Sequence, residues 1–267
     1  VRLHLVLRHR DHVRLRLGDL QDDQLARGRR CPRGERRLPH PHFVDNNSQW
    51  CILNEMKFAE LLELVQGLPW FDLATLVQLS DERRQALITQ LHRFARAEKI
   101  VPLRRGMYIL APAYRQVPAQ PAELANALHR PSYISEQWAL SYHGVIPEGV
   151  PVFTSVTTRT TRRYVNRLGE FSYRNVKQPL FFGFSAVRLG GRKVLIATPE
   201  KALIDHWYLE SGEWTAERLL EMRLAGGVLQ SEKLQQMVHR IGKPRLVRAL
   251  RVWQREIRGA DEGEIEL

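Results

Sequence analysis

The chain has 267 residues, of which 43% are hydrophobic, so it can bury the core of one large domain or of two ordinary ones. Its 41 lysines and arginines exceed its 29 aspartates and glutamates, and the resulting charge of +12 favours a polyanionic partner, either nucleic acid or an acidic membrane surface. The sequence has neither an apolar run of about 18 residues nor an export signal, which argues against a membrane-spanning helix and favours a cytoplasmic protein.

Residues 1–55 differ in composition from everything that follows. They hold 11 arginines but no lysine, five of the ten histidines, and both cysteines, Cys31 and Cys51. Such text, with Val1 in place of a methionine, is typical of a translated GC-rich upstream region, so we predict a non-native leader and a true start at Met56. A basic disordered arm that binds nucleic acid non-specifically is the alternative. Without this segment 30 cationic and 22 acidic residues remain, so a charge of +8 survives in either case.

Residues 56–113 show the pattern of three short helices followed by a hairpin. Apolar residues recur at helical spacing in three stretches, and Gly67, Asp72 and Ser80 stand where helices end or begin. The predicted helices are Lys57–Gln66, Asp72–Leu79 and Glu82 to about Glu98, the last capped by Ser80 and Asp81, and the predicted strands are Ile100–Leu103 and Met107–Leu110. This order of elements within so short a segment predicts a winged helix-turn-helix DNA-binding domain.

The third helix and the hairpin carry the candidate DNA contacts. One apolar stripe of the helix packs inward, and polar residues on the rest of its surface can read a groove. Two arginines before Gly106 stand at the tip of the predicted wing, against phosphates or the minor groove. The candidate contacts are Arg84, Gln85, Thr89, His92, Arg93, Arg96, Arg104 and Arg105. A solvated surface charge is the alternative for each arginine, and because Asp81 and Glu82 repel phosphates we expect contact to begin at Arg84.

We predict a linker at residues 114–121 and a mixed α/β domain at residues 122–258, followed by an acidic tail at residues 259–267. Prolines interrupt the linker, and beyond it the pattern predicts two helices, a small sheet, a helix from Pro199 that packs on this sheet, and a helical C-terminal region. The predicted helices are Ala122–Leu128, Ser132 to about His143, and a series between Thr215 and Arg258, and the predicted strands are Val152–Thr157, Glu170–Val176, Leu180–Phe184, Ala186–Leu189 and Lys193–Ala197. The fold class is therefore α+β.

Two polar clusters in this domain are candidates for function. Hydroxyl groups and arginines on a loop after a strand can hold phosphates, with a solvated turn as the alternative. The candidate nucleic-acid or partner contacts are Thr157, Thr158, Arg159, Arg162 and Arg163. In the second cluster, Glu200 and Asp205 lie on different faces of one helix, which does not suit a metal-dependent nuclease. We expect Glu200 to favour the helix N-terminus and Lys201 to lie at the surface, and we expect no catalytic residue, metal or cofactor.

Six short segments carry a likeness to a known family. They are RRGMY at 104–108, PSYIS at 131–135, ALSYHG at 139–144, IPE at 146–148, VTTR at 156–159 with the following 160–163, and IATPEKALID at 196–205. Together they resemble the AbiE-type antitoxins of bacterial abortive-infection systems, and the likeness extends from Met56 to about Gly212. The leader has no counterpart in that family.

This resemblance implies a type IV toxin–antitoxin system for antiviral defence. It implies an N-terminal winged helix that represses its own operon and a C-terminal domain that neutralises a nucleotidyltransferase-like toxin without a stable complex. The implied partners are duplex operator DNA and that toxin, with no membrane. Two other functions stay open: a winged-helix transcription factor with a ligand- or partner-sensing C-terminal domain, and a phage-defence nuclease. A neighbouring toxin gene favours the first function, a metabolic operon the second, and metal-dependent DNA cleavage the third.

Overall fold

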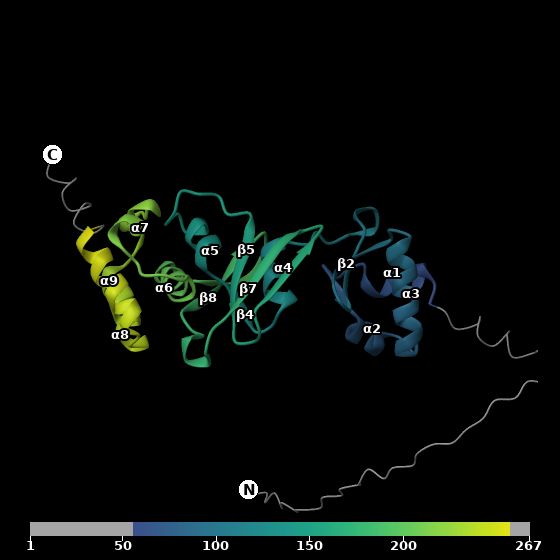
Figure 1. Cartoon of the computed structure of the whole chain (residues 1–267). Coiled ribbons are helices and arrows are strands. Elements are labelled where there is room, and N and C mark those ends of the chain that lie inside the picture. The colour runs from purple at the N-terminus through teal and green to yellow at the C-terminus, as the bar shows by residue number, and fades with distance from the viewer. Residues whose placement is uncertain (1–55, 257–267) are drawn as a thin grey trace, which may run out of the picture. The chain divides into compact units, whose positions relative to one another are not determined.

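The computed structural model describes residues 56–256, in which nine α-helices and two β-sheets form a mixed α+β fold (Figure 1). All of the described residues belong to one compact unit of the chain. The predicted leader at residues 1–55 and the predicted acidic tail at residues 259–267 lie outside the described residues.

Three helices and a three-stranded sheet make up residues 58–110. The elements are α1 (Phe58–Val65), β1 (Phe71–Asp72), α2 (Leu73–Leu79), α3 (Arg84–Arg96), β2 (Ile100–Arg104) and β3 (Met107–Leu110), and the strand order is β1-β3-β2. Helix α2 begins where predicted, because the Asp72 carboxylate accepts hydrogen bonds from the amide (2.8 Å) and hydroxyl (2.9 Å) of Thr75. Gly106, at φ +72°, makes the left-handed turn between β2 and β3.

Helix α3 begins later than predicted. The Ser80 hydroxyl donates a hydrogen bond to the Leu76 carbonyl (2.8 Å) at the end of α2, so it does not cap the next helix. Arg83 is the N-cap of α3, and the first turn of this helix holds no acidic residue. Asp81 and Glu82 therefore precede the helix, so the predictions that Asp81 caps it and that it begins at Glu82 were wrong.

A separate apolar cluster holds these elements together. Phe71 lies at its centre with 1% of its surface exposed, and Tyr108 stacks on it at 6.0 Å between ring centroids. The buried members of this cluster are Met56, Leu61, Val65, Phe71, Leu76, Leu87, Leu91, Ile100 and Leu110. Each of the three helices contributes to it, which explains why the apolar stripes were legible in the sequence.

A six-stranded mixed sheet forms the centre of the larger part of the molecule. Its strands are β4 (Ser132–Ile134), β5 (Val152–Thr157), β6 (Arg162–Asn166), β7 (Gly169–Asn175), β8 (Phe184–Leu189) and β9 (Arg192–Ala197), in the order β6-β7-β5-β4-β9-β8. Strands β5 and β7 pair in parallel, as do β4 and β9, and the other three pairings are antiparallel.

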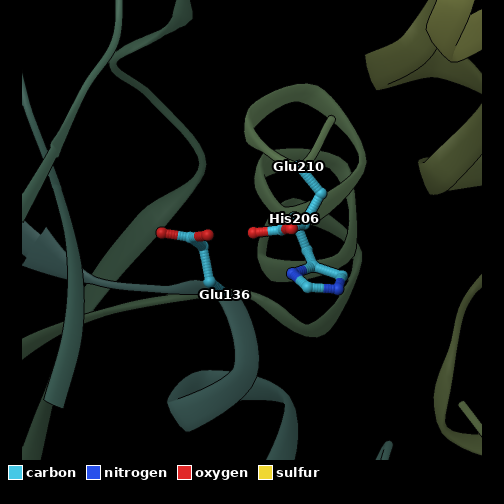
Figure 2. Close-up of side chains that lie close together, drawn as sticks. All are labelled: Glu136, His206 and Glu210. Atoms are coloured by element: carbon cyan, nitrogen blue, oxygen red, sulfur yellow. The ribbon is translucent and has the colours of Figure 1, made fainter. Parts of the chain in front are cut away.

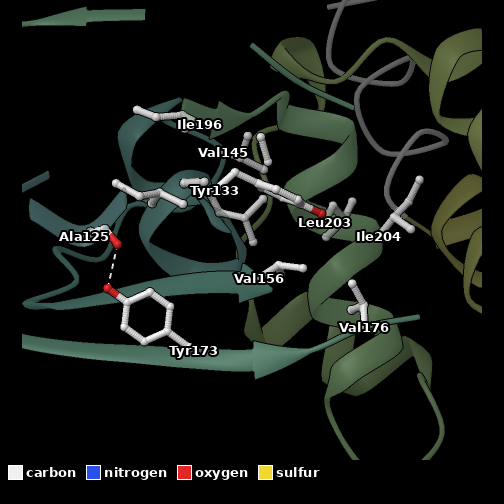
Figure 3. Packing of buried hydrophobic residues seen from close by; sticks show 14 of the residues in the cluster. Ala125, Tyr133, Val145, Val156, Tyr173, Val176, Ile196, Leu203 and Ile204 are labelled. Carbon is white, nitrogen blue, oxygen red and sulfur yellow. Dashed lines mark hydrogen bonds between the residues drawn. The ribbon is translucent and has the colours of Figure 1, made fainter. Parts of the chain in front are cut away.

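Helices cover both faces of this sheet. Tyr173 on β7 donates its hydroxyl hydrogen to the Ala125 carbonyl (2.5 Å) of α4 (Pro121–Leu128), as Figure 3 shows. Tyr133 on β4 instead reaches Asp205 (2.9 Å) of α6 (Pro199–Leu209). Because residues aligned across a sheet share a face, Val156 and Arg174, which lie in register with Tyr133, also face α6. Helix α4 thus covers one face and α6 the other.

The remaining helices pack around α6. They are α5 (Glu136–Tyr142), α7 (Ala216–Glu221), α8 (Ser231–Ile241) and α9 (Pro244–Glu256). Helix α6 contacts α5, α8 and α9 as well as β9, so little of its surface is left for solvent. The helix predicted from Pro199 and its packing on the sheet are confirmed.

Three predicted elements of the larger part were wrong. The predicted helix at Ser132 is a strand, β4, followed by α5, because the β4 backbone pairs with β5 and β9 and the side chains of Tyr133 and Ile134 are buried. The predicted strand at Leu180–Phe184 is a 3-10 turn and a loop, since Pro179 lacks an amide donor and Gly183 adopts φ +76°. Strand β6 was expected as part of a loop, because its charged residues resemble a turn.

Candidate nucleic-acid interface

Helix α3 carries an exposed polar face. Its six candidate contacts, all exposed, are Arg84, Gln85, Thr89, His92, Arg93 and Arg96. Four of them, from Gln85 to Arg96, follow one another at intervals of three or four residues, so they form one row along the helix. The opposite side is anchored by the buried Leu87 and Leu91. The six residues predicted from the sequence therefore lie on the solvent-facing side of α3.

The turn between β2 and β3 places its two arginines differently. Arg105 is exposed, whereas Arg104 is half-buried and donates a hydrogen bond from Nη1 to the Arg105 carbonyl (3.2 Å). Within the described residues, the buried Nε of Arg104 has no hydrogen-bond partner. The Gly106 carbonyl accepts from the Leu73 amide (2.9 Å), which fixes the turn against the start of α2. Only Arg105 is thus presented to solvent at the tip.

The loop after β5 is held by its first threonine. Thr157 is fully buried, its hydroxyl donates to the Pro131 carbonyl (2.7 Å), and it accepts from the Arg159 amide (3.1 Å). This side chain supports the loop and is not accessible to a ligand, so the prediction that it contacts one does not fit the structure. Thr158 is half-buried, and Arg159 is exposed.

The other two arginines of that cluster lie on β6. Both Arg162 and Arg163 are exposed, but Arg163 forms an ion pair with Glu170 (2.7 Å) on the neighbouring strand. Arg162 has no carboxylate partner among the described residues. Arg159 and Arg162 are therefore the members of the predicted cluster whose charge is available to a partner.

Arg159 and Arg162 line a cleft of about 750 Å³ together with Arg104 and Arg130. Aromatic rings and the half-buried His129 form part of its wall. The other residues that line it include Trp70, Tyr164 and Thr160, and the single carboxylate among the described lining residues is Asp72. Three segments of the sequence, around Arg104, Arg130 and Arg159–Arg162, thus bring four arginines to one concave surface, a juxtaposition that no local motif predicts.

The His129 side chain adds a polar group but no charge to the cleft. Burial lowers the pKa of His129, and the nearby Arg159, Arg162 and Arg104 lower it further, against the hydrogen bond of its Nε2 with the Thr160 carbonyl (3.0 Å). The ring also contacts Tyr164, with 6.3 Å between centroids. The two rings are inclined at 55° to each other, so they form an angled aromatic part of the wall.

No protein-family model and no curated protein matches this chain. None of the described helices is both long enough and apolar enough to cross a membrane. The function is therefore argued from the geometry of the described residues.

A buried polar network joins residues 131–135 to residues 196–205. Asp205 accepts hydrogen bonds from the hydroxyls of Tyr133 (2.9 Å) and Ser135 (2.7 Å) and forms an ion pair with Lys201. Lys201 also donates to the Tyr133 hydroxyl (2.9 Å) and is fully buried, so the expectation of a surface lysine was wrong. The cause is the position of α6, which packs against the sheet and other helices. Glu200 lies in the first turn of α6, as expected.

A second cluster contains the buried Glu136 and His206 and the half-buried Glu210, whose potential ligand atoms lie within 4.8 Å of one another (Figure 2). Burial lowers the pKa of His206 to about 4 and raises that of Glu136 to about 8. The Arg174 guanidinium bridges the two carboxylates, donating from Nη1 to Glu136 (2.9 Å) and Glu210 (2.5 Å). An arginine thus supplies positive charge beside these carboxylates, and the arrangement serves as an ion-pair network between α5, α6 and β7.

Proposed function

We propose that the chain is a DNA-binding transcriptional repressor in which residues 56–113 form a winged helix-turn-helix domain. In this proposal α3 enters the major groove of duplex DNA, and the turn between β2 and β3 acts as a short wing. Gln85 and Arg96 read base edges, while Arg105 contacts phosphate. The protein acts in the cytoplasm and performs no catalysis.

The observation that carries this proposal is the exposed face of α3. Gln85, Thr89, His92 and Arg96 form a continuous row on a helix whose other side is anchored in an apolar core. Within the described residues, neither Arg84 nor Arg96 forms an ion pair, so their charges are not neutralised by the protein. A rigid helix that presents unpaired cations and hydrogen-bonding side chains along one side suits a DNA groove.

The test is a mobility-shift titration of the full chain on the DNA upstream of its own gene and on a random duplex of equal length. We expect preferential binding to the upstream DNA. The Gln85→Ala/Arg96→Ala variant should lose that preference, because a base contact contributes about 1–3 kcal/mol of discrimination. All substituted residues are exposed, so the fold should be unaffected.

The matched control is Arg188→Ala/Lys193→Ala, which removes two exposed cations from strands β8 and β9 of the larger sheet. This variant should bind the upstream DNA as the unsubstituted chain does. Equal binding to both duplexes by the unsubstituted chain, or equal losses in the two variants, would show that α3 does not read DNA.

We further propose, on the resemblance of six segments to AbiE-type antitoxins, that the repressor is the antitoxin of a type IV toxin–antitoxin system. The described geometry is compatible with this role, because Tyr133, Lys201 and Asp205 of the family-like segments form one buried network and belong to the framework of the domain. The partner is a nucleotidyltransferase-like toxin that is countered without a stable complex.

This role is tested by expressing the neighbouring nucleotidyltransferase-like gene with and without the chain. We expect growth arrest by the toxin alone and normal growth with the chain, including the Gln85→Ala/Arg96→Ala variant. Continued arrest in the presence of the folded chain would refute the antitoxin role and leave the repressor proposal intact.

A further inference from the structure

Four arginines of the cleft beside β6 have no partner of opposite charge. Arg104, Arg130, Arg159 and Arg162 line this cleft and form no ion pair within residues 56–256. The carboxylate of Asp72, which also lines it, is committed to Thr75 at the start of α2. Because like charges repel, four arginines gathered on one concave surface favour a ligand that brings several negative charges.

The walls of the cleft indicate what else that ligand carries. Trp70, His129 and Tyr164 line it, and His129 and Tyr164 are in contact with each other. Flat rings next to arginines suit a planar ring that stacks on them.

We propose that this cleft binds a nucleoside triphosphate, with the phosphates among the four arginines and the base against the aromatic wall. The volume of about 750 Å³ lies within the range of about 300–1,000 Å³ typical of small-molecule sites. Arginine forms paired hydrogen bonds with phosphate oxygens, which gives orientation as well as affinity. Nucleotide binding at this cleft goes beyond the proposed binding of operator DNA.

A DNA duplex fits this cleft less well than a free nucleotide. The duplex carries its phosphates on the outside of a rod, whereas Arg104 is half-buried at the cleft wall and its Nε is inaccessible to solvent. The exposed row of α3 has no such recess and suits the duplex. The candidate cations therefore form two sites: the exposed face of α3, which suits duplex DNA, and the cleft, which suits a free nucleotide.

The test is isothermal titration of the full chain with ATP and with GTP, without DNA and without divalent metal, at physiological salt. We expect saturable binding of one nucleotide per chain. The Arg159→Ala/Arg162→Ala variant should bind at least about tenfold more weakly, because it loses charge-assisted hydrogen bonds to the phosphates. Inorganic triphosphate should bind more weakly than ATP, because it cannot use the aromatic wall.

The matched control is Arg84→Ala/Arg96→Ala, which removes two exposed cations of α3 and should leave nucleotide affinity unchanged. A Trp70→Phe variant locates the site, because energy transfer from tryptophan to a fluorescent ATP analogue should fall when Trp70 is replaced. Both arginine variants change only exposed side chains, so loss of folding is not expected to obscure the comparison.

The proposal fails if neither nucleotide binds at millimolar concentration. It also fails if the α3 and cleft variants lose affinity equally, which is the sign of non-specific attraction to a basic protein. Loss of duplex binding in the cleft variant, with no nucleotide binding by the unsubstituted chain, assigns the cleft to the DNA surface instead. None of these results affects the base preference measured with Gln85 and Arg96, so the two proposals fail separately.

Discussion

Two arginines of α3 and those of the cleft lack carboxylate partners among the described residues, whereas cations between α6 and the larger sheet have them. Arg84, Arg96 and Arg162 have no carboxylate partner within the described part of the chain. Between α6 and the sheet, by contrast, Lys201 pairs with Asp205, and Arg174 bridges Glu136 and Glu210. Each of these cations counts the same in the net charge. Only the pairing, which the structure supplies, separates charges that maintain the fold from charges left for a partner.

The first way to break this comparison is to remove the partner of a buried cation. Asp205→Ala leaves Lys201 fully buried without a counter-charge and leaves two hydroxyls without their acceptor. We expect a loss of about 3–5 kcal/mol in the free energy of unfolding, measured by urea denaturation. A loss below about 1 kcal/mol would mean that the network contributes little to folding.

Two controls sharpen this measurement. Asp81→Ala removes an exposed carboxylate that precedes α3 and should leave the unfolding midpoint unchanged. Lys201→Met combined with Asp205→Leu removes both charges, and it should destabilise less than Asp205→Ala alone, because no unpaired charge is left in the core.

A smaller loss of stability is expected at Glu136, because this buried carboxyl can be neutral when its arginine partner is removed. Arg174→Leu removes the guanidinium that bridges Glu136 and Glu210, but burial raises the pKa of Glu136, so this carboxyl can stay protonated and uncharged without its partner. We expect a loss of about 2–3 kcal/mol in urea denaturation, since a buried group loses its hydrogen bonds. The control is Arg223→Ala, which breaks an exposed pair with Glu148 and should have no measurable effect. Equal effects in the two variants would contradict the distinction between buried and exposed pairs.

These networks also explain what could and could not be predicted from the sequence. Helix α3 and the turn at Gly106 were legible because their cause is local, in apolar spacing and glycine's freedom at positive φ. Lys201 was misplaced because an ion pair with Asp205, four residues along the same helix, looks like a surface pair in the sequence. Its burial depends on Tyr133, which is distant in the sequence.

Strand β6 and the basic cleft escaped prediction for related reasons. Strand β6 forms the edge of the six-stranded sheet, and charged residues are common on edge strands, so its side chains resembled a turn. The cleft is lined by Arg104, Arg130, Arg159 and Arg162, whose segments are brought together only by the tertiary fold. A pattern within one segment does not indicate which other segments lie beside it in the folded chain.

The turn between β2 and β3, which we propose acts as a wing, provides a test that distinguishes a phosphate contact from a base contact. Arg105→Ala removes an exposed cation at the turn and should weaken binding to all duplexes alike. The slope of log affinity against log salt should fall by about one, as expected for one lost phosphate contact. A change in base preference, with the slope unchanged, would place Arg105 in a groove instead.

The smallest effect on stability is expected from an exposed ion pair. It tests whether pairing without burial contributes to the free energy of unfolding. Arg248 and Glu213 lie 2.9 Å apart, with 55% and 62% of their side chains exposed. Water screens both charges and already solvates each of them, so the pair gains little that solvent does not provide. Arg248→Ala, Glu213→Ala and the double variant should therefore unfold at the same urea concentration as the unsubstituted chain. A midpoint shift as large as that of Arg174→Leu would mean that an ion pair's contribution does not depend on burial here, and pairing could then no longer be used to tell structural cations from binding ones.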